Sequence, residues 1–88
     1  MNALPLTPGR IARSLAGRDQ GRLFVVIREV DEDFVLIADG ELRGVARPKK
    51  KRRKHLRATA SVMELPAQRE PQDFEIRRAL CIEPVKEG

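Results

Sequence analysis

Short apolar runs separated by turn-forming residues make up most of the chain, a pattern typical of strands rather than long helices. The clearest run, residues 23–27, is rich in β-branched and aromatic side chains, which favour strands. Apolar and polar positions roughly alternate over residues 10–15, and residues 34–38 and 56–62 are further strand-like runs. The pattern predicts a small, mainly β fold.

Glycines and acids mark the turns between these runs. Gly17 and Gly21 bracket a polar loop, and the short acidic segment 31–33 should reverse the chain so that its flanking runs form an antiparallel hairpin. Asp39 and Gly40 suit a tight turn, because glycine accepts positive φ without steric cost. We therefore expect consecutive strands to pair as antiparallel neighbours.

Two further segments are expected to extend this sheet. Residues 41–45 should continue it after the Asp39 turn. Residues 56–62 should pair with an earlier strand and so close a small barrel.

The C-terminal part of the chain has a different pattern. Residues 65–72 contain two prolines and are predicted to be a linker. After it, Asp73 is a possible N-cap, Glu75 falls in the first turn, and apolar residues follow at helical spacing. We expect a short amphipathic helix from residue 73 to residue 82 or 83, docked on residues 1–64 or on a partner.

Length and charge limit what such a fold can be. A chain of 88 residues can bury one modest core, so we expect one β domain over residues 1–64 followed by the linker and helix. Residues 1–60 hold 14 Lys and Arg against 7 acids, whereas residues 61–88 hold 4 against 6. This asymmetry indicates a polyanionic partner for the first two thirds of the chain.

Several classes of protein are disfavoured by the composition. One Cys and one His provide no internal disulfide, no metal set and no nucleophile–base pair, so we expect neither a cofactor nor enzymatic activity. Cys81 lies between Leu80 and Ile82 and is expected to be a buried structural thiol. No apolar run approaches the length of a membrane span, so we expect a cytoplasmic protein.

The strongest electrostatic signal is a run of six consecutive cations. It consists of Lys49, Lys50, Lys51, Arg52, Arg53 and Lys54. His55 follows it directly, and Arg57 lies two residues after His55. Because like charges repel and the run offers no apolar face, residues 48–55 are predicted to form an exposed, mobile loop. The alternative to polyanion binding is a solvated charged loop. Neutralising six phosphates would give a salt slope, the change of the logarithm of the binding constant with the logarithm of salt concentration, of about −4 to −5.

The stretch GRIARSLAGRDQGRLFVVI, residues 9–27, resembles the KOW motif, a strand, a glycine-bracketed basic loop and a second strand. The continuation VLIADG, residues 35–40, strengthens the likeness to KOW proteins of the archaeal and eukaryotic large ribosomal subunit. The resemblance covers about residues 8–47, roughly half the chain. It implies an SH3-like barrel whose loops bind ribosomal RNA, chiefly around residues 17–22. The basic run and the tail lie outside the motif and inherit no role from it.

The residues of this loop also suit phosphate binding on chemical grounds. Gly17 and Gly21 would let the backbone turn and expose N–H groups to a phosphate, or simply form a hairpin loop. Four arginines able to grip phosphate lie on or beside the loop: Arg10, Arg13, Arg18 and Arg22. Asp19 could hold a neighbouring arginine, although a simple loop acid is the plainer interpretation.

The three aromatic residues, Phe24, Phe34 and Phe74, all lie in apolar runs and are expected to pack in the core. Without an aromatic platform for stacking, phosphate and shape recognition of folded RNA is favoured over single-strand binding. The sequence therefore predicts a ribosome-associated or ribosomal-RNA-binding protein. The alternative is a protein-interaction module for a translation or transcription factor, whose lysines only steer the encounter.

Overall fold

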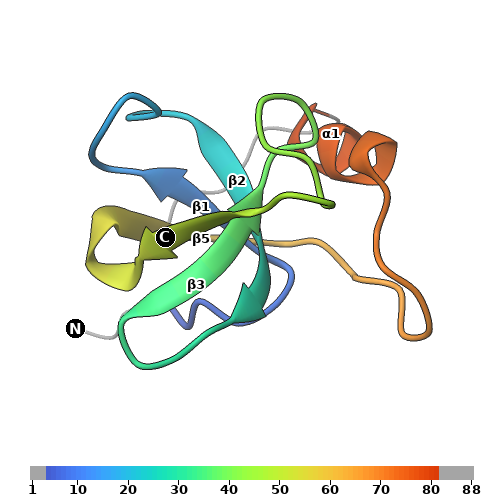
Figure 1. Cartoon of the computed structure of the whole chain (residues 1–88), viewed down its shortest axis with the longest axis horizontal. Coiled ribbons are helices and arrows are strands. Elements are labelled where there is room, and N and C mark those ends of the chain that lie inside the picture. Colours follow the sequence, from blue (N-terminus) through green and yellow to red (C-terminus); the bar gives the residue numbers. More distant parts are fainter. Residues whose placement is uncertain (1–3, 82–88) are drawn as a thin grey trace.

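The computed structural model describes residues 4–81 as one five-stranded antiparallel sheet with a single α-helix beside it (Figure 1). The elements in chain order are β1 (Arg10–Ser14), β2 (Leu23–Glu29), β3 (Phe34–Ala38), β4 (Lys49–Arg52), the 3-10 turn η1 (Arg53–His55), β5 (Leu56–Val62) and α1 (Asp73–Cys81). The prediction of a mainly β fold with one short C-terminal helix is confirmed.

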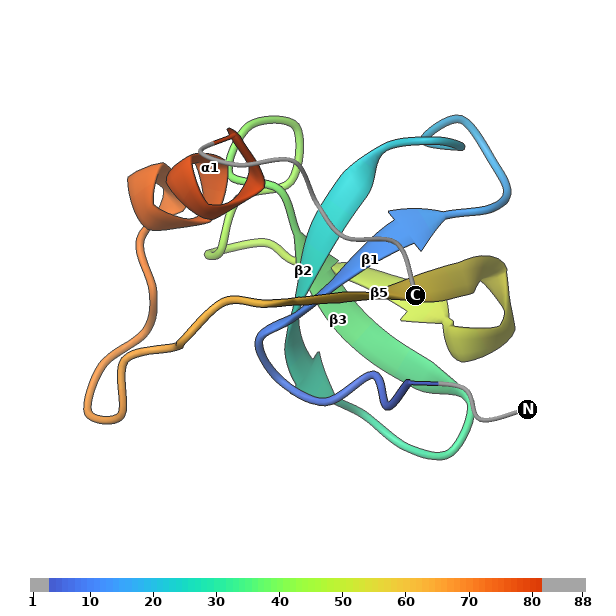
Figure 2. The ribbon, with the colours of Figure 1, turned by 180° about the vertical axis from the view of Figure 1, so that it is seen from behind.

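The strands have the order β4-β3-β2-β1-β5. As predicted, β5 returns to an earlier strand, and it pairs antiparallel with β1. Within residues 4–81, β4 and β5 end the sheet on opposite sides and the ladder does not close into a ring. Figures 1 and 2 show the β1–β2 loop and the β4–β5 turn side by side, away from α1.

Strand alternation gives the sheet two apolar faces. The inner face carries the main core cluster, made of Ala12, Phe24, Val26, Val35, Ile37 and Leu56. On the opposite face, Ile11 and Val25 pack against Ile76 of α1 in a second buried cluster. The helix is therefore held by the outer face of β1 and β2, as its amphipathic pattern requires.

The acidic turns form as predicted. The Asp31 carboxylate accepts the N–H groups of Asp33 and Phe34 at 2.8 and 2.9 Å, which reverses the chain between β2 and β3. Gly40 has a φ of +80°, and the Gly40 carbonyl accepts a 2.7 Å hydrogen bond from Arg77 of α1. The turn that follows β3 thus also receives the helix.

The prediction that residues 41–45 continue the sheet is wrong. The Asp39 carboxylate binds the N–H groups of Glu41 and Arg43, both at 2.9 Å, and the Arg43 carbonyl accepts the N–H groups of Asp39 and Gly40. These local bonds use the groups that a strand ladder would need. The segment is a compact loop beside α1.

Helix α1 begins at Asp73 as predicted, but Asp73 is not its N-cap. The Gln72 carbonyl accepts the first helical N–H groups, and the Asp73 carboxylate instead accepts the Val45 N–H at 2.7 Å. Cys81 is exposed, so the expectation of a buried thiol is wrong, because α1 buries the side that carries Ile76. The predicted end at residue 82 or 83 lies outside the described residues.

None of the helices within residues 4–81 is long and apolar enough to cross a membrane.

Candidate nucleic-acid interface

The basic run is a strand followed by a 3-10 turn, so the prediction of a mobile loop over residues 48–55 is wrong. Lys49–Arg52 forms β4, which pairs with β3 in the register Ile37↔Lys49 to Phe34↔Arg52. Successive side chains in a strand point to opposite faces. The alternation therefore separates neighbouring cations and gives each face its own partners.

Two lysines of β4 lie on the inner face, next to Ile37 and Val35, where they meet an acid from the β1–β2 loop. The Asp19 carboxylate accepts hydrogen bonds from Lys49 Nζ at 2.8 Å and from Lys51 Nζ at 3.0 Å. Asp19 is only 8% exposed and Lys51 is also buried. Asp19 is thus an anchor between the loop and β4, not a simple loop acid.

Burial disfavours the charged form of Asp19, yet its pKa falls well below the usual range. Hydrogen bonds from Lys49, from the Ser14 hydroxyl at 2.7 Å and from Lys51 outweigh the burial. The carboxylate is therefore ionised wherever the protein is folded at ordinary pH. It joins two predicted contact regions that lie some 30 residues apart in the sequence.

The other two cations of β4 lie on the outer face. Lys50 Nζ is 4.6 Å and the Arg52 guanidinium carbon 4.9 Å from the centre of the Phe34 ring, within cation–π range. Neither has a carboxylate partner among residues 4–81. Both cations are exposed on this face, and the charge of Lys50 also helps to lower the pKa of Asp31.

The expected core packing of the phenylalanines holds for only one of them in full. Phe24 is buried, Phe34 is half-buried under the two cations, and Phe74 is 52% exposed. The prediction for Phe74 is wrong because α1 buries Ile76, and two residues along a helix correspond to about 200° of rotation. An exposed aromatic ring is therefore available, contrary to the expectation from sequence.

The end of the run has mixed surroundings. Arg53 pairs with Glu29 at 2.9 Å and donates to the Asp31 carbonyl. Lys54 is exposed, while the half-buried His55 uses its carbonyl to accept the Leu15 N–H at 2.8 Å. The 3-10 turn is thereby fastened to the start of the β1–β2 loop.

The β1–β2 loop depends on its glycines. Gly17 and Gly21 have φ values of +84° and +89°, which side chains rarely adopt. The Gly21 N–H donates to the Ser14 carbonyl at 2.8 Å, which favours the hairpin-loop alternative at this glycine. Arg13 Nη1 in turn donates to the Gly21 carbonyl at 2.7 Å. The loop is a closed hairpin that presents side chains.

The arginines of the predicted site divide into separate places. Arg18 is exposed at the loop. Arg57 lies directly opposite Arg13 in the β1–β5 register, so Arg13 and Arg57 share a face of the sheet. Arg22 pairs with buried Asp39 at 3.1 Å. Arg10 bonds the carbonyls of residues 5 and 59 and pairs with Val62 at the opposite end of β1, so it does not join the loop.

Asp39 resembles Asp19 in its surroundings. Burial disfavours its charge, but the N–H groups of Arg43 and Glu41 and the Arg22 guanidinium lower its pKa. The ionised Asp39 stays paired with Arg22 and weakens the attraction of that arginine for a phosphate.

Sequence reasoning considered Asp19 only as a loop acid or an arginine partner, and it missed the lysines and Ser14 that Asp19 binds and the exposed ring of Phe74. The sequence contains a weak signal for the Asp19 contacts, because the two lysines that bind Asp19 are two residues apart and so share one face of a strand. No family model matches the chain, and the KOW resemblance stays a prediction.

Proposed function

We propose that the protein is a KOW-type RNA-binding protein that grips phosphates of folded RNA, ribosomal RNA in the first instance. The observation that carries the proposal is the Asp19 anchor, because it brings the β1–β2 loop and the basic strand β4 into one surface. Such a role would place the protein in the cytoplasm and requires no catalytic group.

The proposed barrel is SH3-like. In support, β1 lies between β2 and β5, and the strands enclose one apolar cluster on their inner face. Closure between the end strands β4 and β5 would come from this cluster and from the short η1 turn that joins them. The Asp19 contact with Lys51 lies beside this cluster on the inner face, where Lys51 is opposite Val35.

The proposed phosphate surface uses cations without acid partners. Around the β1–β2 loop and the β4–β5 turn, three exposed cations have no carboxylate partner within residues 4–81: Arg18, Lys54 and Arg57. Within the basic run, carboxylates occupy Lys49, Lys51 and Arg53. Lys50, Arg52 and Lys54 remain available in the run. The run should therefore contribute a salt slope of about −2 to −3, rather than the value for six cations.

Titration of a labelled, folded ribosomal RNA fragment by fluorescence anisotropy at several salt concentrations tests the proposal. The triple variant Arg18→Ala, Lys54→Ala, Arg57→Ala should weaken binding and reduce the magnitude of the salt slope by about 2 to 3. A control with equal charge loss changes exposed arginines elsewhere: Arg43→Ala, Arg47→Ala, Arg78→Ala. It should retain most of the affinity.

Two results would overturn the proposal. One is no binding of the wild-type protein at low salt, and the other is equal loss in both triple variants, which would indicate charge attraction without a site. Crosslinking in cells followed by sequencing of the attached RNA then identifies whether the target is ribosomal.

The alternative, a protein-interaction module, is favoured by one observation. Leu42, in the loop beside α1, is 73% exposed and could contact a partner protein. Deleting residues 49–54 would remove β4, so this alternative is better tested by the triple variants. It predicts partners that survive both nuclease treatment and these substitutions, and loss of partners after nuclease contradicts it.

A further inference from the structure

The outer face of β2, β3 and β4 places cations around an apolar strip. Arg28, Leu36 and Lys50 lie directly opposite one another across the three strands, and Phe34 and Arg52 form the next row. Residues paired in register share a face of the sheet. Three exposed cations therefore surround two half-buried apolar side chains on this face.

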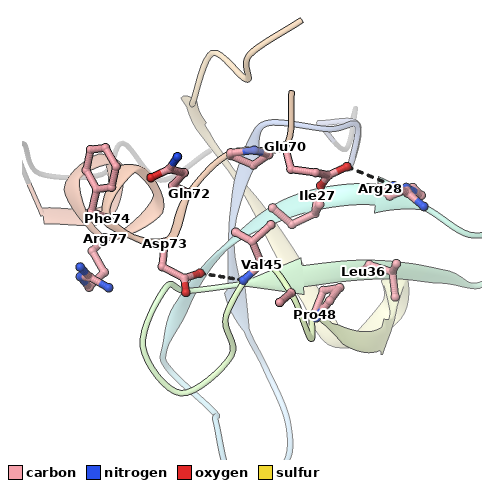
Figure 3. A pocket seen from close by; sticks show the side chains of 12 residues that line it. Ile27, Arg28, Leu36, Val45, Pro48, Glu70, Gln72, Asp73, Phe74 and Arg77 are labelled. Carbon is pink, nitrogen blue, oxygen red and sulfur yellow. Dashed lines mark hydrogen bonds and ion pairs between the residues drawn. The ribbon is translucent and has the colours of Figure 1, made fainter. Parts of the chain in front are cut away.

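A groove of about 910 Å³ begins at the row of Arg28 and Leu36 and extends to α1. Its apolar lining comes from β2, β3 and the loop before β4, through Ile27, Leu36, Val45 and Pro48. Figure 3 shows Val45 and Ile27 towards the helix, Leu36 farther along the strands, and Phe74 on the helix at the opposite end. The volume lies within the range typical of sites for small organic ligands.

Two acids and two arginines line the groove, and Arg77 already donates to the Gly40 carbonyl at 2.7 Å. The Asp73 carboxylate already accepts the Val45 N–H at 2.7 Å. Glu70 pairs with Arg28 at 3.5 Å, and both side chains are about two-thirds exposed. Such an exposed pair contributes little, so Arg28 can exchange this partner for a phosphate. Gln72 adds an exposed side-chain amide.

We propose that this groove binds one unpaired nucleotide of the RNA, an inference that rests on the proposed function. The base would stack on the exposed ring of Phe74, and the adjoining phosphates would contact Arg28 and Lys50. RNA-binding proteins commonly recognise unpaired bases in loops and bulges by stacking on aromatic side chains.

A nucleotide suits this site better than a peptide because the groove continues into a cationic face of the sheet. Its lining shares Leu36 with the cationic outer face, and Leu36 lies opposite Lys50 of β4. The inner side of the same strand holds the Asp19 anchor. Lys54 of the proposed phosphate surface lies two residues beyond Arg52, so the cations of the outer face lead towards that surface.

Short single-stranded probes, hexauridylate and hexaadenylate, test the proposal by anisotropy and by amide NMR shifts. Phe74→Ala should weaken binding of the probes by about 5- to 150-fold and leave the salt slope unchanged. Phe74→Leu should weaken binding as well, because it keeps apolar surface but removes the ring. Leu42→Ala is the control, since it removes an exposed apolar side chain outside the groove lining.

The outcomes separate this proposal from the proposed function. If the wild-type protein binds folded ribosomal RNA but Phe74→Ala binds the probes as tightly as wild type, the nucleotide site is refuted and the loop surface stands. Failure to bind any RNA at low salt refutes both. If Phe74→Leu retains full affinity while Phe74→Ala loses it, the groove is an apolar docking site of another kind, and the proposal is overturned.

Discussion

Replacing Asp19 with asparagine should destabilise the protein and weaken RNA binding, although it removes a negative charge and so makes the protein more basic. The carboxylate accepts charge-assisted hydrogen bonds from Lys49 and Lys51, together with one from Ser14. Lys51 is at least as buried as Asp19, so the variant leaves a buried ammonium without its counter-ion.

The size of the effect follows from these contacts. Hydrogen bonds to charged groups contribute about 1.5–3 kcal/mol each, and breaking a fully buried pair costs about 3–5 kcal/mol. Lys49 is 30% exposed and can recover part of its solvation, so we expect a loss of about 2–4 kcal/mol. In urea unfolding followed by circular dichroism, this lowers the midpoint by about 1–3 M.

The pH dependence provides an independent check. A group whose pKa is lowered by folding stabilises the native state above its unfolded pKa. For Asp19 that ordinary value is 3.8, so the difference between wild type and Asp19→Asn should be complete at pH 7. It should shrink as the pH falls below about 3.8, towards the lowered native pKa.

The control is Asp33→Asn, because Asp33 is an exposed turn acid and its replacement causes the same change of charge. It should alter stability by less than about 0.5 kcal/mol. If Asp19→Asn is as stable as this control, or binds folded RNA more tightly than wild type, the anchor does not organise the surface and simple charge attraction explains binding.

Three further predictions concern the packing and charge of α1. Ile76→Ala should cost about 2–5 kcal/mol in urea unfolding, because Ile76 is fully buried between helix and sheet; a loss below about 1 kcal/mol would contradict that contact. Gly40→Ala should cost more than Gly21→Ala, since both glycines have positive φ but an added Cβ meets the helix only at Gly40; equal melting temperatures would refute this. Hydrogen bonds from Arg69 hold the pKa of Glu75 at about 2, so an NMR titration of Arg69→Ala should show that pKa rising towards 4.5.

The parts of the fold that were predictable depend on local pattern. The four apolar strands and the start of α1 follow from side-chain periodicity and flanking turn residues, which act within a few positions. The strand β4 could not be predicted this way. Six consecutive cations should repel one another and disfavour a strand. Pairing with β3 and the ion pair with the distant Asp19 stabilise the strand in spite of this repulsion.

The candidate site was predictable in its composition but not in its arrangement. The sequence identifies Arg18 and Lys54 as cations, yet it does not show that Lys51 is buried or that Arg10 lies at the opposite end of β1. Exposure of Phe74 depends on which side of a short helix the sheet covers. These facts arise from contacts between residues far apart in the sequence.

The position of β4 at the end of the sheet order has a consequence for solubility. An end strand offers unpaired backbone groups to other chains, and lysines on such a strand oppose edge-to-edge association. Lys50 and Arg52 keep their charge on the exposed side of this strand. The cations proposed to hold RNA should thus also keep free copies of the protein apart, and neutralising them should promote aggregation in the absence of RNA.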